Sequence, residues 1–512
     1  MLATLLLIVT FILVYLNLKN IIPYEWPMYF MDEYINHRKT WIMLDAIKEF
    51  NIVKLFGSGG YGYGFIYSFI VMGLNTYFII NDQTTMMQLI PRIITIIAIL
   101  ISIFFMHKIV KKHLNPINTI LFCLITISFP IFWARSSAGF FPDWVLNCFL
   151  IISIYYLEKD RFKFSKNFLL ASLFLGLGIS FKLQGLILLP LLVVYIAQPL
   201  TSNLNIKTIT NQAKLLAKSF GIVFLAYFIG NPYVIHPVGL IALKRQLTLG
   251  INEQSNAIQE GYFFLTSILE KTISYHFMNQ LFFLALIVIL CISTYSFFTK
   301  KAKSIFPIIA ISCLTCLSYL MIIAKMNAGR YYLPIIIIAT LTIIPYLSLL
   351  PSKKQKNILL AILVIQITLN FNHYKKIASP CYSQKFIKIR TENNQLIINT
   401  LKNKITNKTH ILVSPMASFN YQALKLNHTQ IHTLFGSLSD WMLEKEKYKE
   451  RYSAQGNLKI KVFHKKDYII FQKPKTVKEL VNPMLAKIFS GQLGYKLIAE
   501  NETIWIFENT IY

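Results

Sequence analysis

Residues 89–112 read LIPRIITIIAILISIFFMHKIVKK, an almost unbroken apolar run that ends in a cluster of lysines. A run of this length is long enough to cross the hydrocarbon core of a bilayer as an α-helix. Basic residues that follow such a run collect on the cytoplasmic side of a membrane. The stretch therefore predicts a membrane-spanning helix and indicates which of its ends faces the cytoplasm.

Similar apolar runs recur along most of the chain. The first covers Met1 to about Leu18, and others start near Ile117, Trp144, Phe168, Gly185, Leu215, Leu281, Ile305, Leu333 and Ile358. Together they predict about eleven spans. The opening run lacks a basic start and a small-residue cleavage site, so we interpret it as a retained helix rather than a signal peptide.

The composition agrees with a membrane protein. Of the 512 residues, 55% are hydrophobic and only 14% are charged, whereas an ordinary globular protein has about 25% charged residues. A water-soluble enzyme and a disordered chain are both excluded. The net charge of +29 is explained by basic cytoplasmic loops rather than by a nucleic-acid partner.

Basic clusters follow every second apolar run. They consist of Lys108, Lys111 and Lys112; Lys159, Arg161, Lys163 and Lys166; Lys207, Lys214 and Lys218; Lys300, Lys301 and Lys303; and Lys353, Lys354 and Lys356. The positive-inside rule places these five loops in the cytoplasm. The connections between them, including a long first loop over residues 20–88, then face outward, as does the tail.

One segment inside the first outer loop leaves an alternative open. Tyr61–Ile80 is apolar enough to span the membrane and follows a glycine-rich stretch. We interpret it as an interfacial or re-entrant helix against the outer leaflet. If it spans instead, the chain has twelve spans and an outer N-terminus.

The tail differs in kind, because residues 372–512 mix apolar and polar residues as a soluble domain does. Short strands are predicted at Ile411–Val413, Ile431–Phe435, Asp467–Phe471 and Thr503–Phe507, with amphipathic helices at Asp440–Arg451 and Val477–Phe489. We predict an α-helical polytopic membrane domain over residues 1–371 and an extracytoplasmic α/β domain over residues 372–512. Asn501 begins an Asn-x-Thr glycosylation sequon, a match that is common by chance.

The outward loops carry most of the candidate chemistry. The residues concerned are Asp32, Glu33, His37, Arg135, Asp143, Lys182, Arg330 and Tyr331. Charges beside a membrane are costly unless they are paired, hydrated or functional, and a single one is explained equally well by snorkelling. Carboxylates and cations from different loops nevertheless map to one membrane face, which favours a site at the outer interface.

Five motifs occur in a fixed order along the chain. They are Met31-Asp-Glu-Tyr34, Gly60-Tyr-Gly-Tyr-Gly-Phe65, Arg135-Ser136 with Pro142-Asp143, Lys182-Leu-Gln-Gly185 and Gly329-Arg-Tyr-Tyr-Leu-Pro334. This order resembles the GT-C glycosyltransferases of the protein O-mannosyltransferase and aminoarabinose-transferase type. Those are polytopic enzymes that use polyprenyl-phosphate sugars on the outer membrane face. Their first outer loop contains juxtamembrane helices, in agreement with our interpretation of Tyr61–Ile80.

The resemblance implies an inverting sugar transfer. Asp32 would accept the proton of the acceptor hydroxyl, with Glu33 positioning it. Lys182 and Arg330 would stabilise the departing lipid phosphate, and Asp143 would bind the sugar or acceptor. Substrate-binding roles are also expected for the three remaining candidates, Arg135, Tyr331 and His37.

The sequence favours chemistry without a cofactor. Asp32, Glu33 and His37 could hold a divalent ion, as some relatives with this architecture do. There is no HExxH motif and no His/Cys pattern with zinc spacing. We therefore predict no essential metal.

The sequence leaves several acceptor classes and alternative functions open. The expected partners are a polyprenyl-phosphate sugar and an acceptor that is a lipid, a glycan or a protein, in a bacterial cytoplasmic membrane. The alternatives are a transporter or flippase of lipid-linked saccharides and an O-antigen ligase- or polymerase-like enzyme. A transporter would place charges near the bilayer midplane, whereas here they lie at one rim.

Overall fold

The computed structural model describes the chain except for residues 22–30, 58–63, 82–83, 137–141, 202–204, 242, 245–267, 300–303, 324–328, 379–383, 407, 414–416, 418, 427–429, 434–466, 474–487, 492–493 and 511–512. The chain divides into two compact units. The first comprises Met1–Asn20, Gly60–Leu74 and Gln88–Ser379. The second comprises Ile21–Gly59, Asn75–Met87 and Pro380–Tyr512.

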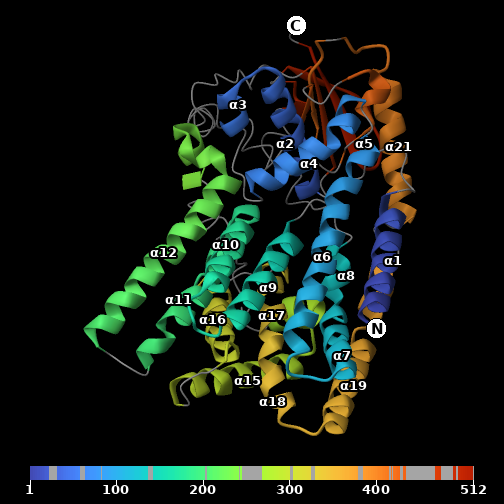
Figure 1. The fold of residues 1–512 in the computed structure, drawn as a ribbon. Helices are drawn as coiled ribbons and strands as arrows, with labels where there is room; N and C mark the ends of the chain where they lie inside the picture. Colours follow the sequence, from blue (N-terminus) through green and yellow to red (C-terminus); the bar gives the residue numbers. More distant parts are fainter. Residues whose placement is uncertain are drawn as a thin grey trace. The chain divides into compact units, whose positions relative to one another are not determined.

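The first unit is helical throughout its described part (Figure 1). Its N-terminal half contains α1 (Leu2–Ile21), the start of α4 (Phe65–Ile80), α6 (Leu89–Val110), α7 (Pro116–Ile127), α8 (Pro130–Ser136), α9 (Asp143–Asp160), α10 (Lys166–Phe181), η1 (Leu183–Leu188), α11 (Pro190–Ala197), η2 (Gln198–Thr201), α12 (Ile206–Gly230) and η3 (Pro232–Ile235). Its C-terminal half contains η4 (Ile268–Ser274), α15 (Gln280–Thr299), α16 (Phe306–Ser318), η5 (Tyr319–Ile323), α17 (Gly329–Thr340), η6 (Leu341–Ile343), α18 (Ile344–Ser348), α19 (Ser352–Leu369) and α20 (Phe371–Ala378).

Several of these helices are long and apolar enough to cross a membrane. Among the described residues they are Leu2–Lys19, Leu89–Val110, Leu183–Leu200, Ile206–Gly230, Gln280–Thr299 and Gly329–Ser348, and the bent pair α19–α20 adds one more candidate. Phe65–Ile80, Pro116–Ile127, Lys166–Phe181 and Phe306–Ile322 are shorter apolar helices. The predicted helical multi-pass architecture is thus confirmed, while the count of eleven spans and the orientation of Tyr61–Ile80 stay predictions.

Close helix packing forms the centre of this unit. α10 lies between α9 and α12, and α6 packs against α9 (Figure 1). A Cβ on Gly176 of α10 would lie 2.6 Å from the Val223 carbonyl oxygen of α12, so a glycine is needed for the two backbones to approach. Ser172 and Ser219 share a hydrogen bond of 2.8 Å across the same interface.

The second unit combines helices with a small sheet. Its helices are α2 (Met31–Lys48), α3 (Ile52–Gly57), the end of α4, α5 (Thr84–Met87), α21 (Gln384–Leu401) and η8 (Tyr421–Leu424). Its strands are β1 (Ile411–Val413), β2 (Ile431–Thr433), β3 (Tyr468–Gln472), β4 (Tyr495–Glu500) and β5 (Ile504–Asn509), in the order β2-β1-β3-β5-β4. β1 pairs in parallel with β2 and β3, and β5 pairs antiparallel with β3 and β4.

The predicted strands are recovered in this sheet with shifts of a few residues at their ends, and β4 is an addition that the sequence reading missed. Apolar side chains pack on both sheet faces, with Ile470 and Ile506 in one cluster and Ile469 and Phe507 in the other. The predicted helix at 440–451 and most of that at 477–489 lie outside the described residues.

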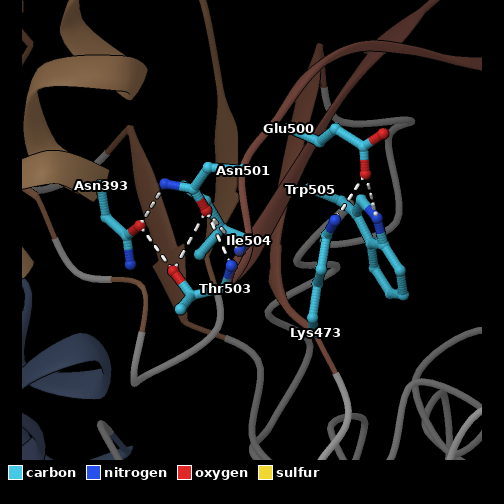
Figure 2. Close-up of polar contacts among 7 residues, drawn as sticks. All are labelled: Asn393, Lys473, Glu500, Asn501, Thr503, Ile504 and Trp505. Atoms are coloured by element: carbon cyan, nitrogen blue, oxygen red, sulfur yellow. Dashed lines mark hydrogen bonds and ion pairs between the residues drawn. The ribbon is translucent and has the colours of Figure 1, made fainter. Parts of the chain in front are cut away.

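A hydrogen-bond network fastens the β4–β5 turn to α21 (Figure 2). The Asn501 side-chain oxygen accepts from the backbone N–H groups of Thr503 and Ile504, both at 2.9 Å. The Asn501 amide nitrogen and the Thr503 hydroxyl each donate to Asn393 of α21 at 2.7 Å. The amide nitrogen of this sequon is therefore engaged within the domain.

Candidate active site

An ion pair joins two of the predicted site residues in the first unit. Asp143 is the first residue of α9, and Lys182 directly follows α10 in an extended conformation. Because consecutive helices α9 and α10 pack side by side, the start of one lies near the end of the other. The Lys182 ammonium contacts a carboxylate oxygen of Asp143, and the two side chains are only 6% and 2% exposed.

Both charges suit the helix ends that carry them. The N-terminus of a helix favours an anion and the C-terminus favours a cation, because of the aligned peptide dipoles. Asp143 and Lys182 match this rule on α9 and α10. Burial of two charges is costly unless they are paired, so the pair is stable as a unit and each member depends on the other.

The start of α17 adds an aromatic ring and a second cation. The Lys182 ammonium lies 5.6 Å from the centroid of the Tyr331 ring, and the Arg330 guanidinium carbon lies 5.3 Å from it. Both distances are within the range of cation–π attraction. The Gln184 amide donates to the Tyr331 carbonyl at 2.8 Å. The structure therefore brings Asp143, Lys182, Arg330 and Tyr331 together.

Two glycines set the backbone beside these cations. Gly64 has φ +70°, and a Cβ there would lie 2.2 Å from the Ser180 carbonyl oxygen, close before Lys182. A Cβ on Gly329 would lie 2.5 Å from the His276 ring, directly before Arg330. The last glycine of the Gly60–Phe65 motif thus packs against the backbone that leads to Lys182.

A buried asparagine reinforces the first of these contacts. The Asn231 side-chain oxygen accepts from the Phe65 N–H at 2.8 Å, and its amide nitrogen donates to the Ser180 carbonyl at 3.0 Å. Asn231 and Gln184 hold backbone groups of the candidate site and were not among the predicted site residues. Asn231 lies in none of the predicted motifs, and Gln184 lies in the Lys182–Gly185 motif, but neither contact is visible in the sequence because each is made to backbone atoms of a distant segment.

The predicted acidic motif lies in the second unit. Asp32 and Glu33 belong to the first turn of α2, where carboxylates are favoured by the helix dipole; their side chains are outside the described part. His37 lies one turn further along α2 and is fully buried. The structure does not test the roles predicted for these three residues.

Arg135 lies in the last turn of α8, and its side chain is likewise outside the described part. No group of three or more His, Cys, Asp or Glu side chains suited to a metal ion occurs among the described residues. Since Asp32 and Glu33 are not covered by that statement, the metal question stays a prediction.

The comparison with protein families bears on the class of enzyme. Residues 54–229 match the family described as dolichyl-phosphate-mannose-protein mannosyltransferase. This range includes Asp143 and Lys182, while Asp32 precedes it and Arg330 follows it. Together with the apolar helices, the match supports a membrane glycosyltransferase of the GT-C superfamily, as the motifs predicted. A comparison with curated proteins finds no match.

Proposed function

We propose that the chain is an inverting glycosyltransferase that moves a sugar from a polyprenyl-phosphate donor to an acceptor. The observation that carries the proposal is the meeting of Lys182, Arg330 and Tyr331 with Asp143. These residues come from three helices, or their ends, within the bundle. Two cations around one aromatic ring suit a donor that carries both a phosphate and a sugar.

In the proposed step, the acceptor hydroxyl oxygen attacks the anomeric carbon of the donor. The bond from that carbon to the phosphate oxygen breaks, and the lipid phosphate leaves with the electron pair. Asp32 takes the proton of the hydroxyl, with Glu33 positioning the base. The configuration at the anomeric carbon is inverted because that carbon undergoes a single displacement, without a covalent sugar–enzyme intermediate.

The ion pair between Asp143 and Lys182 gives Lys182 and Arg330 different roles. Asp143 and Lys182 together carry no net charge, so Asp143 orients the ammonium while Arg330 supplies the net positive charge for the phosphate. A guanidinium can bind two phosphate oxygens at once, which an ammonium does not. Both groups would stabilise the negative charge that develops on the leaving group.

The remaining features of the proposal rest on the sequence. Five basic clusters support an outer-face reaction with the C-terminal domain extracytoplasmic, and the membrane in the proposal is a bacterial cytoplasmic membrane. The reaction needs no metal, and the acceptor is a lipid, a glycan or a protein. Arg135 and His37 complete the substrate-binding set.

A donor panel tests the proposal directly. Purified full-length protein is incubated with polyprenyl-phosphate mannose, which the matched family's description suggests, and with other polyprenyl-phosphate sugars, and mass spectrometry follows consumption of each donor. Release of polyprenyl phosphate from at least one donor is expected, and chelation of divalent ions should not reduce it. If no donor is bound or consumed, the proposal is refuted and the result favours the transporter alternative.

Asp32→Asn tests the proposed base. It should abolish transfer while the protein still reaches the membrane in normal amount. Asp45→Asn, the same substitution further along α2, is the matched control and should keep most activity. Near-normal turnover by Asp32→Asn would refute the assignment.

A further inference from the structure

The short helix α20 departs from the direction of the span before it. α19 and α20 are separated by Asn370 and bent by 59°. α20 reads FNHYKKIA and has no fully buried residue. A short helix with apolar and basic sides that turns away from a span is typical of a helix lying in the membrane interface.

The exposed side of α20 combines lysines with aromatic rings. The Lys375 ammonium lies 4.7 Å from the centroid of the Phe371 ring, and the Lys376 ammonium lies 5.9 Å from that of Tyr275. Both lysines are exposed, as are Phe371 at 54% and Tyr275 at 43%. We call Phe371, Lys375, Lys376 and Tyr275 the α20 patch.

The opposite side of α20 is fastened to the bundle. The Tyr374 hydroxyl donates to the Ser128 carbonyl just before α8, and α20 packs against α8. The His373 ring, in turn, packs edge-on against Tyr275 of the patch, with ring centroids 4.4 Å apart. Lys19 of α1 donates to the carbonyl oxygens of Ile377 and Ala378, the last two residues of α20. These contacts fix the position of α20 and therefore of the α20 patch.

The sequence around the patch contains few carboxylates. The sequence has no Asp or Glu from residue 271 to residue 391, and none in α1 or α8. Neither α20 itself nor α1 and α8, which contact it, contains a carboxylate, and the helical segment that leads to Tyr275 contains Glu270. Adjacent lysines at a membrane interface attract anionic headgroups.

We propose that the α20 patch binds the phosphate headgroup of an anionic phospholipid. Lys375 and Lys376 contact the phosphate, while the acyl chains lie along Phe371 and Leu369, which is 52% exposed. The apolar residues beside the lysines favour a lipid over an acidic soluble protein. The residues of this patch differ from Lys182 and Arg330, to which the proposed function assigns the donor phosphate.

Retention of lipid by the purified protein is the test. Full-length protein is reconstituted in nanodiscs of phosphatidylcholine with phosphatidylglycerol, and native mass spectrometry counts the phosphatidylglycerol retained on release. Each interfacial lysine contributes about 1 kcal/mol toward an anionic surface. Lys375→Gln/Lys376→Gln should therefore weaken retention about 25-fold, since 1.4 kcal/mol is a factor of ten.

A matched variant removes two charges elsewhere. Lys388→Gln/Lys402→Gln changes two exposed lysines at α21 and should retain lipid as the unaltered protein does. Equal retention by the α20 variant, or equal loss in the α21 variant, would overturn the proposal. Displacement of the retained lipid by stoichiometric polyprenyl phosphate would also overturn it, because the patch would then belong to the donor site. Retention is measured without turnover, so its outcome does not depend on the proposed enzyme activity.

Discussion

The buried pair of Asp143 and Lys182 makes the sharpest prediction about this fold. Removing one member of a buried ion pair leaves the other charge without its counterion and costs about 3–5 kcal/mol. This agrees with the attraction of about 4 kcal/mol between two unit charges in contact at an effective dielectric of 20. With side chains 2% and 6% exposed, the pair is in the buried class. Asp143→Val and Lys182→Met should each lower the free energy of unfolding by that amount.

The double variant separates the effect of the ion pair on stability from the role of Lys182 in activity. Apolar residues of similar size can replace a buried pair at little cost, so Asp143→Val/Lys182→Met should unfold within about 1 kcal/mol of the unaltered protein. Its transferase activity should nevertheless stay lost, because Lys182 also serves the donor phosphate in the proposed mechanism.

Denaturant titration of the protein in mixed micelles measures these free energies. The control is Lys404→Met, which breaks a pair with Glu508 whose side chains are 41% and 29% exposed; such pairs contribute about 0–1 kcal/mol. The reasoning fails if the double variant is as unstable as the singles, or if the singles cost no more than the control.

Three further predictions follow from local geometry. Gly329→Ala should reduce sugar transfer more than tenfold, because the new Cβ would force α17 away from the His276 ring. The second substitution His276→Ala should restore activity in the same assay. Gly64→Ala should lower the unfolding midpoint because its Cβ would lie 2.2 Å from a carbonyl oxygen, whereas Gly73→Ala, with nothing within 4 Å, should not. A hydrogen bond from Lys473 lowers the pKa of Glu500 below 4.5. The stabilisation from the ionised Glu500 is therefore present above that pH and is lost as the pH falls through the lowered pKa. Hydrogen exchange should show that acid reduces protection in the β4–β5 hairpin, and this acid dependence should be absent in Glu500→Gln.

The membrane helices were predictable because the bilayer imposes one simple requirement, an apolar run of sufficient length. α6 begins at Leu89, where the apolar run begins. The β4 strand was missed because it lies at the sheet edge, paired only with β5. Its residues Lys496 to Ala499 are exposed or only partly buried, so the strand lacks the continuous apolar signal of β3 and β5.

The candidate site was predictable as a set of residues and not as a set of contacts. The sequence assigned Asp143 to the sugar and Lys182 to the phosphate, while the structure joins them in one ion pair. They are separated by a helical hairpin, and only the packing of α9 on α10 brings them together. Gln184 was visible in the same motif as Lys182, but its contact with a backbone carbonyl of Tyr331 has no counterpart in residue spacing.

The two glycines explain how such a site can be assembled from short motifs. Gly64 lies against the backbone of Ser180 and Phe181, directly before Lys182, and Gly329 lies against His276, directly before Arg330. In both cases a cation follows a position at which a backbone and a neighbouring group approach too closely for a Cβ. A shift of an ångström at either contact would move the cation relative to Tyr331, and catalytic geometry tolerates little displacement. The positions of the charges are thus fixed by residues that carry no charge: Gly329 precedes Arg330 in the same motif, whereas Gly64 supports Lys182 from a different motif.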